Sequence, residues 1–430
     1  RRNPKGGYYA IGTACNKRNP PWGGDYCAQN MSALWMKFDE SGNSLGKKHY
    51  TNGPNQTGLS IANTSSGATA WVGERTRLVG SKWQYKAIFY KLTGTKVNYS
   101  KVVDLGGWNA TSIELTRDGG FIIGAGNNVI WIIKTDKNGK MKWDTTIGDK
   151  KDEFATSTTI NSKQEIIVTW YKTVKEKFSI RKIIFSSSKK ESTKKKKKTS
   201  FIVKLDKTGG KKWETDFIDE GETLSSFITY HRKQILLTGQ KSTQFNGRGD
   251  AWLVSLDNKG KQKWQESYGG RGADGGNYAT KVSDGGYIMA GYTDSYGNGK
   301  NDVWLIKTDF TGEKEWSRVY GGKMDDYGWG VTETLDRGFV VVGETFSYGS
   351  GQSDIYIFKV DSSGNKIWDN TFGGIAEDVG YSIANSDDGG YLIASQTRSY
   401  GKGGSDGMLV KFDSNGKKEW EKLYGGKGLD

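Results

Sequence analysis

The sequence contains only two histidines, two cysteines and four prolines in 430 residues, and it has no run of about 18 apolar residues. Catalytic triads and histidine-based metal centres are therefore largely excluded, because His49 and His231 both stand beside basic residues on segments that we expect to be exposed. Without a long apolar run, no membrane-spanning segment is predicted. No Gly-rich loop leads into a helix, so no nucleotide-binding loop is predicted either.

The two cysteines bracket one short loop. Cys15 and Cys27 enclose a Pro-Pro-Trp-Gly-Gly stretch, and a pair of this kind indicates a disulfide and an oxidising compartment. A reduced metal or redox pair is the alternative, but it lacks both Cys-x-x-Cys spacing and a nearby histidine.

Glycine and aromatic residues are abundant, and the last third of the chain repeats one pattern. An aspartate at the start of a turn and a tryptophan after it each recur every 52 residues, at Asp257, Asp309, Asp361 and Asp413 and at Trp264, Trp316, Trp368 and Trp420. A constant period of this size is typical of stacked supersecondary units. The chain is therefore interpreted as a repeat protein.

Each repeat contains four β-like pieces, which in one unit span 327–334, 338–343, 354–360 and 366–372. The pieces are rich in β-branched and aromatic residues and are separated by Asp-Gly, Gly-Gly and Ser-Gly turns, as in antiparallel hairpins. Four antiparallel strands in a repeat of about 50 residues form a blade of a β-propeller.

The pattern of the second strand recurs eight times along the chain. We therefore predict an all-β protein, a single β-propeller domain over residues 1–430, with eight blades of four antiparallel strands. Seven blades is the alternative, if one weak unit is a decoration. The first strand of the first blade is missing from both ends, so we expect a longer parent chain or, as the alternative, a strand donated by a neighbouring chain.

A Lys-rich insertion at 173–199 interrupts the fourth unit, between its second and third strands. It contains five consecutive lysines: Lys194, Lys195, Lys196, Lys197 and Lys198. Because like charges repel, we interpret the insertion as a flexible, solvated loop. A contact with a membrane surface or a polyanion is the alternative.

The net charge of +15 is unevenly placed along the chain. Residues 1–250 carry 43 Lys and Arg against 22 Asp and Glu, whereas residues 251–430 carry 20 against 26. A solvated basic face is the favoured interpretation, and a patch for polysaccharide or an acidic surface layer is the alternative. Nucleic acid is not expected as a partner, because no recognised binding motif accompanies the charge.

Five Asn-x-Ser/Thr sequons lie in the first quarter of the chain and none lies after it. They are Asn30, Asn55, Asn63, Asn98 and Asn109. Together with the cysteine pair, this cluster indicates a glycosylated extracellular protein.

The carboxylates of the regular region are periodic. One series follows a Gly-Gly pair and another begins the third strand, at Asp274, Asp326 and Asp378 and at Asp302, Asp354 and Asp406. A residue that recurs in every blade is interpreted as part of the scaffold. Ca²⁺ bound in the acidic, Gly-rich loop 294–302 and its counterparts is the alternative, although EF-hand spacing is absent. No other metal or cofactor is expected.

Loop length varies most between the second and third strands of a unit. These loops include the Ser-Tyr-Gly triplets that begin at Ser295, Ser347 and Ser399. They would share one face of the disc with the loops that join successive units. We predict that any binding face lies there, because binding residues concentrate in variable loops.

The stretch 320–345, which runs from a Tyr-Gly-Gly turn through Asp-Arg-Gly-Phe-Val-Val-Val-Gly, resembles the β-propeller repeats of secreted and cell-surface proteins of bacteria and archaea. The Asp-x-x-Gly-x-x-x-Trp turn is also similar to the repeat of quinoprotein-type propellers. The resemblance is specific over 251–430. It implies an extracytoplasmic propeller, commonly a binding or structural module. Quinoprotein activity is not implied, because those enzymes typically pair adjacent cysteines near the cofactor.

We therefore expect a non-enzymatic propeller, extracellular or on the cell surface, that serves as a structural or binding and assembly module. Its expected partners are other surface proteins, copies of itself or polysaccharide. One alternative is a polysaccharide hydrolase or lyase with acids in the mouth of the central channel, for which Glu220, Glu222 and Glu333 are candidates. Another is a subunit of an extracellular filament or sheath.

Overall fold

The computed structural model describes residues 8–15, 31–39, 44–50, 56–63, 68–79, 82–93, 96–103, 110–126, 129–138, 140–148, 153–175, 196–217, 222–231, 234–242, 249–401 and 405–424. Within these ranges the regular structure is entirely β, with 31 strands. None of the described segments forms a helix that is long and apolar enough to cross a membrane.

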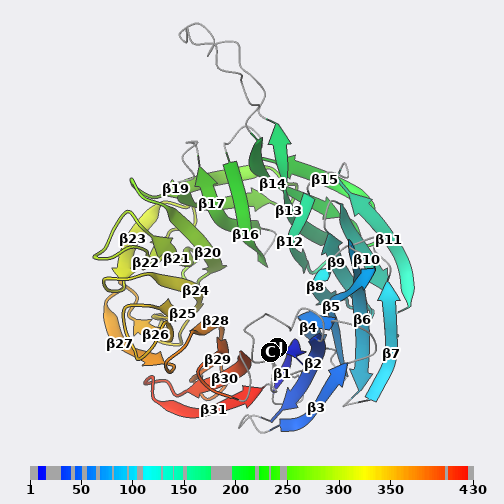
Figure 1. The fold of residues 1–430 in the computed structure, drawn as a ribbon. Helices are drawn as coiled ribbons and strands as arrows, with labels where there is room; N and C mark the ends of the chain where they lie inside the picture. The colour runs from blue at the N-terminus through cyan, green and yellow to red at the C-terminus, as the bar shows by residue number, and fades with distance from the viewer. Residues whose placement is uncertain are drawn as a thin grey trace, which may run out of the picture.

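The strands form antiparallel sheets that follow one another around a single ring (Figure 1). Seven sheets are blades of four antiparallel strands each, and the unit at the N-terminal end is a sheet of three described strands. The predicted all-β single propeller is confirmed. Its seven four-stranded blades match the alternative count, and the first unit contains three strands among the described residues.

The strands of the N-terminal half are as follows. The three-stranded sheet contains β1 (Tyr8–Cys15), β2 (Met31–Phe38) and β3 (Ser44–Tyr50). The next blade contains β4 (Gln56–Asn63), β5 (Ala68–Val79), β6 (Lys82–Thr93) and β7 (Lys96–Val103). It is followed by β8 (Ala110–Leu115), β9 (Phe121–Gly126), β10 (Ile130–Thr135) and β11 (Met141–Ile147). The fourth unit contains β12 (Glu153–Ile160), β13 (Ile166–Lys175), β14 (Lys196–Leu205) and β15 (Lys211–Asp216).

The remaining blades are more regular. The fifth unit contains β16 (Glu222–His231), β17 (Gln234–Ser242), β18 (Asp250–Asp257) and β19 (Gln262–Tyr268). The sixth contains β20 (Asp274–Lys281), β21 (Tyr287–Thr293), β22 (Asp302–Thr308) and β23 (Lys314–Tyr320). The seventh contains β24 (Asp326–Glu333), β25 (Phe339–Thr345), β26 (Asp354–Val360) and β27 (Lys366–Phe372). The last contains β28 (Asp378–Asn385), β29 (Tyr391–Thr397), β30 (Asp406–Phe412) and β31 (Lys418–Tyr424).

Burial within a blade changes from its inner to its outer strand. The first strand, such as β24 or β28, borders the centre of the ring (Figure 1). All seven residues of β22 and of β26 are buried, whereas the outer strands β23 and β27 are largely exposed. Neighbouring blades cover both faces of the third strand, which explains why its middle is an apolar run, as at 303–306 in β22.

The repeated tryptophans pack between blades. The rings of Trp316 and Phe339 lie 6.0 Å apart, centroid to centroid, across one junction between blades. The Trp316 indole also donates a hydrogen bond of 3.1 Å to the carbonyl of Ser362 in the next blade. Trp316 therefore joins two blades both by buried area and by one directional bond.

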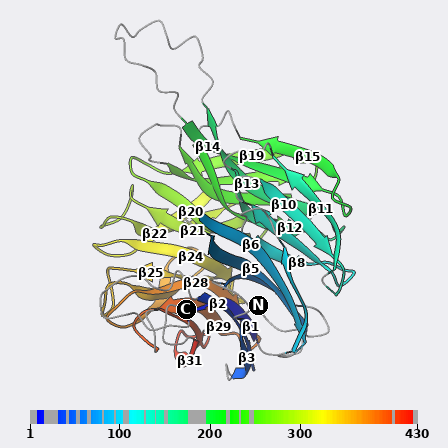
Figure 2. The ribbon, with the colours of Figure 1, turned by 45° about the vertical axis from the view of Figure 1, so that its right-hand side comes forward.

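The ring closes where the first sheet meets the last blade (Figures 1 and 2). Phe38 of β2 packs on Tyr424 of β31 with ring centroids 4.3 Å apart. Both belong to a buried cluster that also contains Met36, Leu392 and Leu409. Apolar packing between the two ends of the chain therefore holds the three-stranded sheet in the ring.

Candidate functional site

The turn aspartates serve the scaffold, as the sequence predicts. Asp309 Oδ1 accepts hydrogen bonds from the backbone NH groups of Thr311 and Glu313, at 2.7 and 2.9 Å. A hydrogen bond from the Thr311 hydroxyl and those from the backbone lower the pKa of Asp309. Asp361 accepts the same two backbone bonds in the next unit. These carboxylates are committed to their turns.

Most of the predicted covalent features fall outside the described residues. Cys15 ends β1 and Cys27 lies in an undescribed stretch, so the disulfide stays a prediction. Of the sequons, Asn63 ends β4 and Asn98 lies in β7. Asn30, Asn55 and Asn109 lie outside the described ranges, and glycosylation also stays a prediction.

The ends of the Lys-rich insertion differ from the predicted loop. Lys194 and Lys195 lie outside the described residues, but Lys196, Lys197 and Lys198 belong to β14 and pair with β13. The Lys198 ammonium lies 5.7 Å from the centre of the Tyr171 ring. Both ends of the insertion therefore extend the hairpin of β13 and β14, in which Tyr171 pairs with Ser200 and Thr173 pairs with Lys198. Tyrosine and threonine are favoured in strands.

The acids that the sequence singled out do not converge on one site. Glu333 at the end of β24 accepts hydrogen bonds from the backbone NH and the hydroxyl of Ser283 in the adjacent blade, at 2.8 and 2.5 Å. It therefore links two blades. Glu222 begins β16, and Glu220 lies outside the described residues.

The loop face forms as predicted. Ser347, between β25 and β26, donates from Oγ to Asp326 at 2.7 Å, and its Oγ accepts from the NH of Met324 at 3.0 Å. The Tyr348 hydroxyl donates to the carbonyl of Gly321. The loops between second and third strands therefore contact the loops that join successive units.

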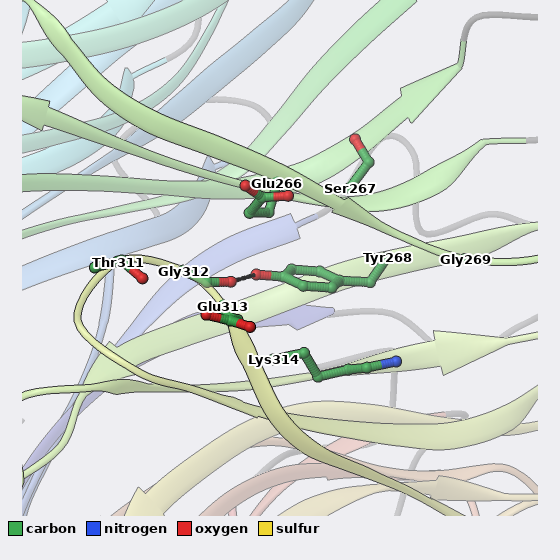
Figure 3. A pocket seen from close by; sticks show the side chains of 8 residues that line it. All are labelled: Glu266, Ser267, Tyr268, Gly269, Thr311, Gly312, Glu313 and Lys314. Carbon is green, nitrogen blue, oxygen red and sulfur yellow. Dashed lines mark hydrogen bonds between the residues drawn. The ribbon is translucent and has the colours of Figure 1, made fainter.

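A cleft of about 520 Å³ opens between two neighbouring blades (Figure 3). It is lined by β19 and by the turn between β22 and β23, with Glu266, Glu313 and Lys314 as its charged groups. The Tyr268 hydroxyl spans its floor and donates to the carbonyl of Gly312 at 2.5 Å. Burial raises the pKa of Tyr268, so this phenol stays neutral and acts as a strut.

A more distinctive group of side chains gathers where β24 and β28 meet. We call it the Glu344 cluster, and it consists of Trp329, Glu344, Ser353, Glu377, Tyr381 and Arg398. Backbone contacts hold its members together: Ser353 pairs with Glu377 in an isolated parallel bridge, and the NH of Arg398 donates to the carbonyl of Glu377 at 2.8 Å.

The two aromatic members come from β-bulges in neighbouring inner strands. Trp329 is the bulge residue of β24, and Tyr381 occupies the same place in β28. A bulge leaves one residue out of the ladder and redirects its side chain. The two rings lie 6.4 Å apart, and Tyr381 is 50% exposed. They form an accessible aromatic surface close to the centre of the ring.

The charged members differ in environment. Burial raises the pKa of Glu344, and the nearby charge of Glu377 raises it further. Ser353 and Trp329 partly oppose this shift, although neither the Ser353 hydroxyl nor the Trp329 indole NH completes a hydrogen bond. Glu377 instead forms an ion pair with Arg398. The cluster thus combines a carboxyl group held toward its neutral form with two polar groups that have no partner.

Sequence reasoning missed this cluster, although a signal was present. At intervals of 52 residues, Glu344 corresponds to Tyr292 and Gln396, and Trp329 corresponds to Asn277. Glu344 and Trp329 therefore differ from the residues at the same positions of other blades. Such differences, and not the recurring residues, show where one blade has a chemistry of its own. Nowhere in the described ranges do three or more His, Cys, Asp or Glu side chains gather in a way that could hold a metal ion.

No family model and no curated protein matches this chain. Among solved structures, Sqt1 from Chaetomium thermophilum is similar with a TM-score of 0.54 and 11% identity, over 86% of this chain and 88% of that one. The Dos1 propeller has a TM-score of 0.51 and 10% identity, over 85% and 84% of the two chains. A quinohemoprotein alcohol dehydrogenase from Comamonas testosteroni has a TM-score of 0.48 and 12% identity, over 95% and 77%. Identities this low support the propeller fold alone.

Proposed function

We propose that this protein is a non-enzymatic, extracytoplasmic propeller that binds a glycan at the Glu344 cluster. The observation that supports this most directly is the combination of an exposed aromatic ring, Tyr381, with the partly exposed charged side chains of Glu377 and Arg398 beside it. Sugar rings present apolar faces to aromatic side chains and hydroxyls to hydrogen-bonding groups, and binding sites typically combine a few placed polar groups with aromatic walls. The location outside the cytoplasm rests on the predicted disulfide and sequons.

The members of the cluster divide this task between them. Trp329 and Tyr381 would stack against the sugar, while the more exposed Arg398 and Glu377 would form hydrogen bonds with its hydroxyls. Glu344 can accept or, when protonated, donate a hydrogen bond. The ion pair between Glu377 and Arg398 holds the rim in place.

The test is binding of neutral oligosaccharides to the purified full chain, first on a glycan array and then by calorimetry. Trp329→Asn borrows the residue that the preceding blade has at this position, Asn277, and should weaken binding at least tenfold, or about 1.4 kcal/mol. The control Phe310→Ala removes an aromatic ring that is 67% exposed on the outer rim, and it should leave affinity unchanged. Equal affinities for the two variants, or no glycan bound by the unaltered protein, would contradict the proposal.

A second candidate function is hydrolysis of a polysaccharide at the same cluster. It is favoured by the contrast between Glu344, whose pKa is raised by burial, and Glu377, which is ion-paired, because glycosidases use one protonated and one ionised carboxyl. Release of reducing ends that is lost in Glu344→Gln, with glycan binding retained, would establish this activity. Binding without release would leave the non-enzymatic proposal standing.

A further inference from the structure

Three junctions between blades each bring two aspartates together. The first aspartate begins the third strand of one blade, and the second begins the first strand of the next blade. We call these the junction pairs: Asp250 with Asp274, Asp302 with Asp326, and Asp354 with Asp378. Five of the six residues are 1% exposed or less, and Asp250 is half-buried.

The pair of Asp354 and Asp378 illustrates the geometry. The NH of Asp378 donates to the carbonyl of Ser353 at 2.9 Å, which ties the two strand starts together. A Cβ placed on Gly373 would stand 1.9 Å from Asp354 Oδ1 and 2.7 Å from Asp378 Oδ2. Both carboxylates therefore face the same point, and glycine is required there because any side chain would enter the space between them.

The other two pairs repeat this arrangement. The corresponding point on Gly321 lies 2.0 Å from Asp302 Oδ1 and 2.6 Å from Asp326 Oδ2. On Gly269 the distances to Asp250 Oδ1 and Asp274 Oδ2 are 2.1 and 2.8 Å.

Four of the six carboxylates are only half satisfied. Asp378 Oδ2 accepts from the NH of Gly374 at 2.8 Å and from the hydroxyl of Ser399 at 2.6 Å, and Asp354 Oδ2 accepts from the NH of Ser350 at 2.9 Å. Asp354 Oδ1 and Asp378 Oδ1 are buried and have no hydrogen-bond partner. The Oδ1 atoms of Asp274 and Asp326 are in the same condition. An unsatisfied buried acceptor costs about 1–3 kcal/mol, and more when it is charged.

The charge is also uncompensated in the described part of the chain. The cations Lys300 and Arg398 pair with Asp325 and Glu377, and no ion pair among the described residues includes a member of the junction pairs. Burial raises the pKa of Asp354, and the charge of Asp378 raises it further. Asp302 and Asp250 are affected in the same way by burial and by their partners. Two buried like charges at each junction require a counter-charge.

At one other junction of the ring, both aspartates are replaced by threonines. Thr199 occupies the place of Asp302, because each stands seven residues before the aspartate of the following turn. Thr223 occupies the place of Asp274, because each lies shortly before the β-bulge of its strand. There the NH of Ser200 donates to Thr223 Oγ1 at 2.8 Å, and the Ser200 hydroxyl donates to the carbonyl of Thr223. A junction can therefore be built without charge, and the two carboxylates are lost together, as expected if they act as a unit.

We propose that each junction pair binds one divalent cation of the Ca²⁺ class, which cross-links two adjacent blades. The donors are carboxylate oxygens, which suit hard cations and disfavour Zn²⁺ and Cu²⁺. Two aspartates neutralise one divalent charge. Backbone carbonyls and water would complete the coordination, which Ca²⁺ accepts more readily than Mg²⁺ because its geometry is less strict. The sites lie where the strands begin, so each takes only the last aspartate of the Gly-rich loop that the sequence indicated, such as Asp302, and adds an aspartate from the next blade.

The experiment uses the full chain, stripped with EDTA and titrated with CaCl₂ or MgCl₂ at constant pH by calorimetry and native mass spectrometry. We expect three Ca²⁺ per chain, a rise in Tm with Ca²⁺ and a weaker response to Mg²⁺. Asp354→Thr combined with Asp378→Thr, which copies the junction of Thr199 and Thr223, should lower the count to two. The control Asp361→Asn alters an exposed turn carboxylate and should keep it at three.

A second measurement keeps the test independent of how the variants fold. The Tyr400 hydroxyl donates to the carbonyl of Gly373, so this phenol lies beside one site and should sensitise bound Tb³⁺ in the unaltered protein. Luminescence that Ca²⁺ displaces supports the proposal. Absence of Tb³⁺ and Ca²⁺ binding at millimolar concentration, with Tm rising as the pH falls, would overturn it and assign a shared proton to each pair.

Discussion

The ammonium of Lys204 lies 2.5 Å from the carboxylate of Glu165, and the two side chains are only 2% and 9% exposed. Lys204 also donates to Asn258 in the next blade, at 2.6 Å to its side-chain oxygen and 3.0 Å to its carbonyl. One buried ion pair therefore joins two strands of a blade and reaches across a junction. It shows how the divergent half of the ring holds its blades together where the repeat is weak.

The ion pair of Glu165 and Lys204 should make the free energy of unfolding depend on pH in the acidic range. Burial alone raises the pKa of Glu165, but hydrogen bonds from Lys204, Lys212 and Asn161 outweigh it and bring the pKa to about 2. Since this is below the ordinary value of 4.5, the pair stabilises the fold above pH 4.5, and its contribution is lost as the pH falls toward 2. It amounts to about 2–3 kcal/mol.

Urea unfolding of Glu165→Gln at pH 7 checks this expectation. The variant should lose about 3 kcal/mol, because it leaves the buried Lys204 ammonium without its counter-charge. The difference from the unaltered protein should shrink as the pH approaches 2. Glu214→Gln breaks the more exposed pair with Lys211 and should cost less than about 1 kcal/mol. Equal losses in the two variants would contradict the assigned role.

The stabilisation that a repeated tryptophan provides can be divided into the packing of its ring and the hydrogen bond of its indole NH. Trp264 packs on Tyr287 at 5.5 Å between ring centroids, and its indole NH donates to the carbonyl of Phe310 at 3.1 Å. Trp264→Phe keeps a ring but loses the bond and should cost about 1 kcal/mol. Trp264→Ala should cost about 3 kcal/mol or more, as judged by thermal unfolding. Similar losses for Phe and Ala would show that packing contributes little.

Glycine at a junction should be irreplaceable. Gly373→Ala would place a methyl group 1.9 Å from Asp354 Oδ1, so the buried carboxylates or the blades that hold them must shift. We expect a loss above about 2 kcal/mol.

Gly407 provides a matched control. A Cβ on this residue would meet only the carbonyl of Tyr424, at an ordinary 3.5 Å. Gly407→Ala should therefore change the free energy of unfolding by less than about 0.5 kcal/mol. If the two alanine variants were equally stable, the close approach of the carboxylates at Gly373 would be refuted.

Closure of the ring should depend on Phe38. This side chain is fully buried against Tyr424 of the last blade. Phe38→Ala should cost about 3–5 kcal/mol and loosen the three-stranded sheet, so that proteases cut first within residues 1–50. Leu45→Ala, which alters a side chain that is 57% exposed, should leave the cleavage pattern unchanged. Cleavage of Phe38→Ala at random positions would argue against closure by this contact.

Much of the fold could be predicted because its determinants are local or periodic. The turn at Asp309 is encoded by a carboxylate that bonds to NH groups two and four residues later, and Trp316 recurs at a constant interval. The Glu344 cluster could not be predicted in the same way. Trp329 and Tyr381 are 52 residues apart in sequence, and they meet because bulges in two separate strands turn them toward each other.

By itself, the sequence determined the β class, the strand pattern, the length of the repeat and the turn chemistry, because each depends on neighbours within one hairpin or on simple recurrence. Tertiary structure alone decided how the three-stranded sheet joins the ring through Phe38 and Tyr424. It also decided that scaffold aspartates such as Asp354 and Asp378 face one another across a junction. Burial turns these recurring carboxylates into charges that need a partner, since desolvation and mutual repulsion arise only when the blades are packed.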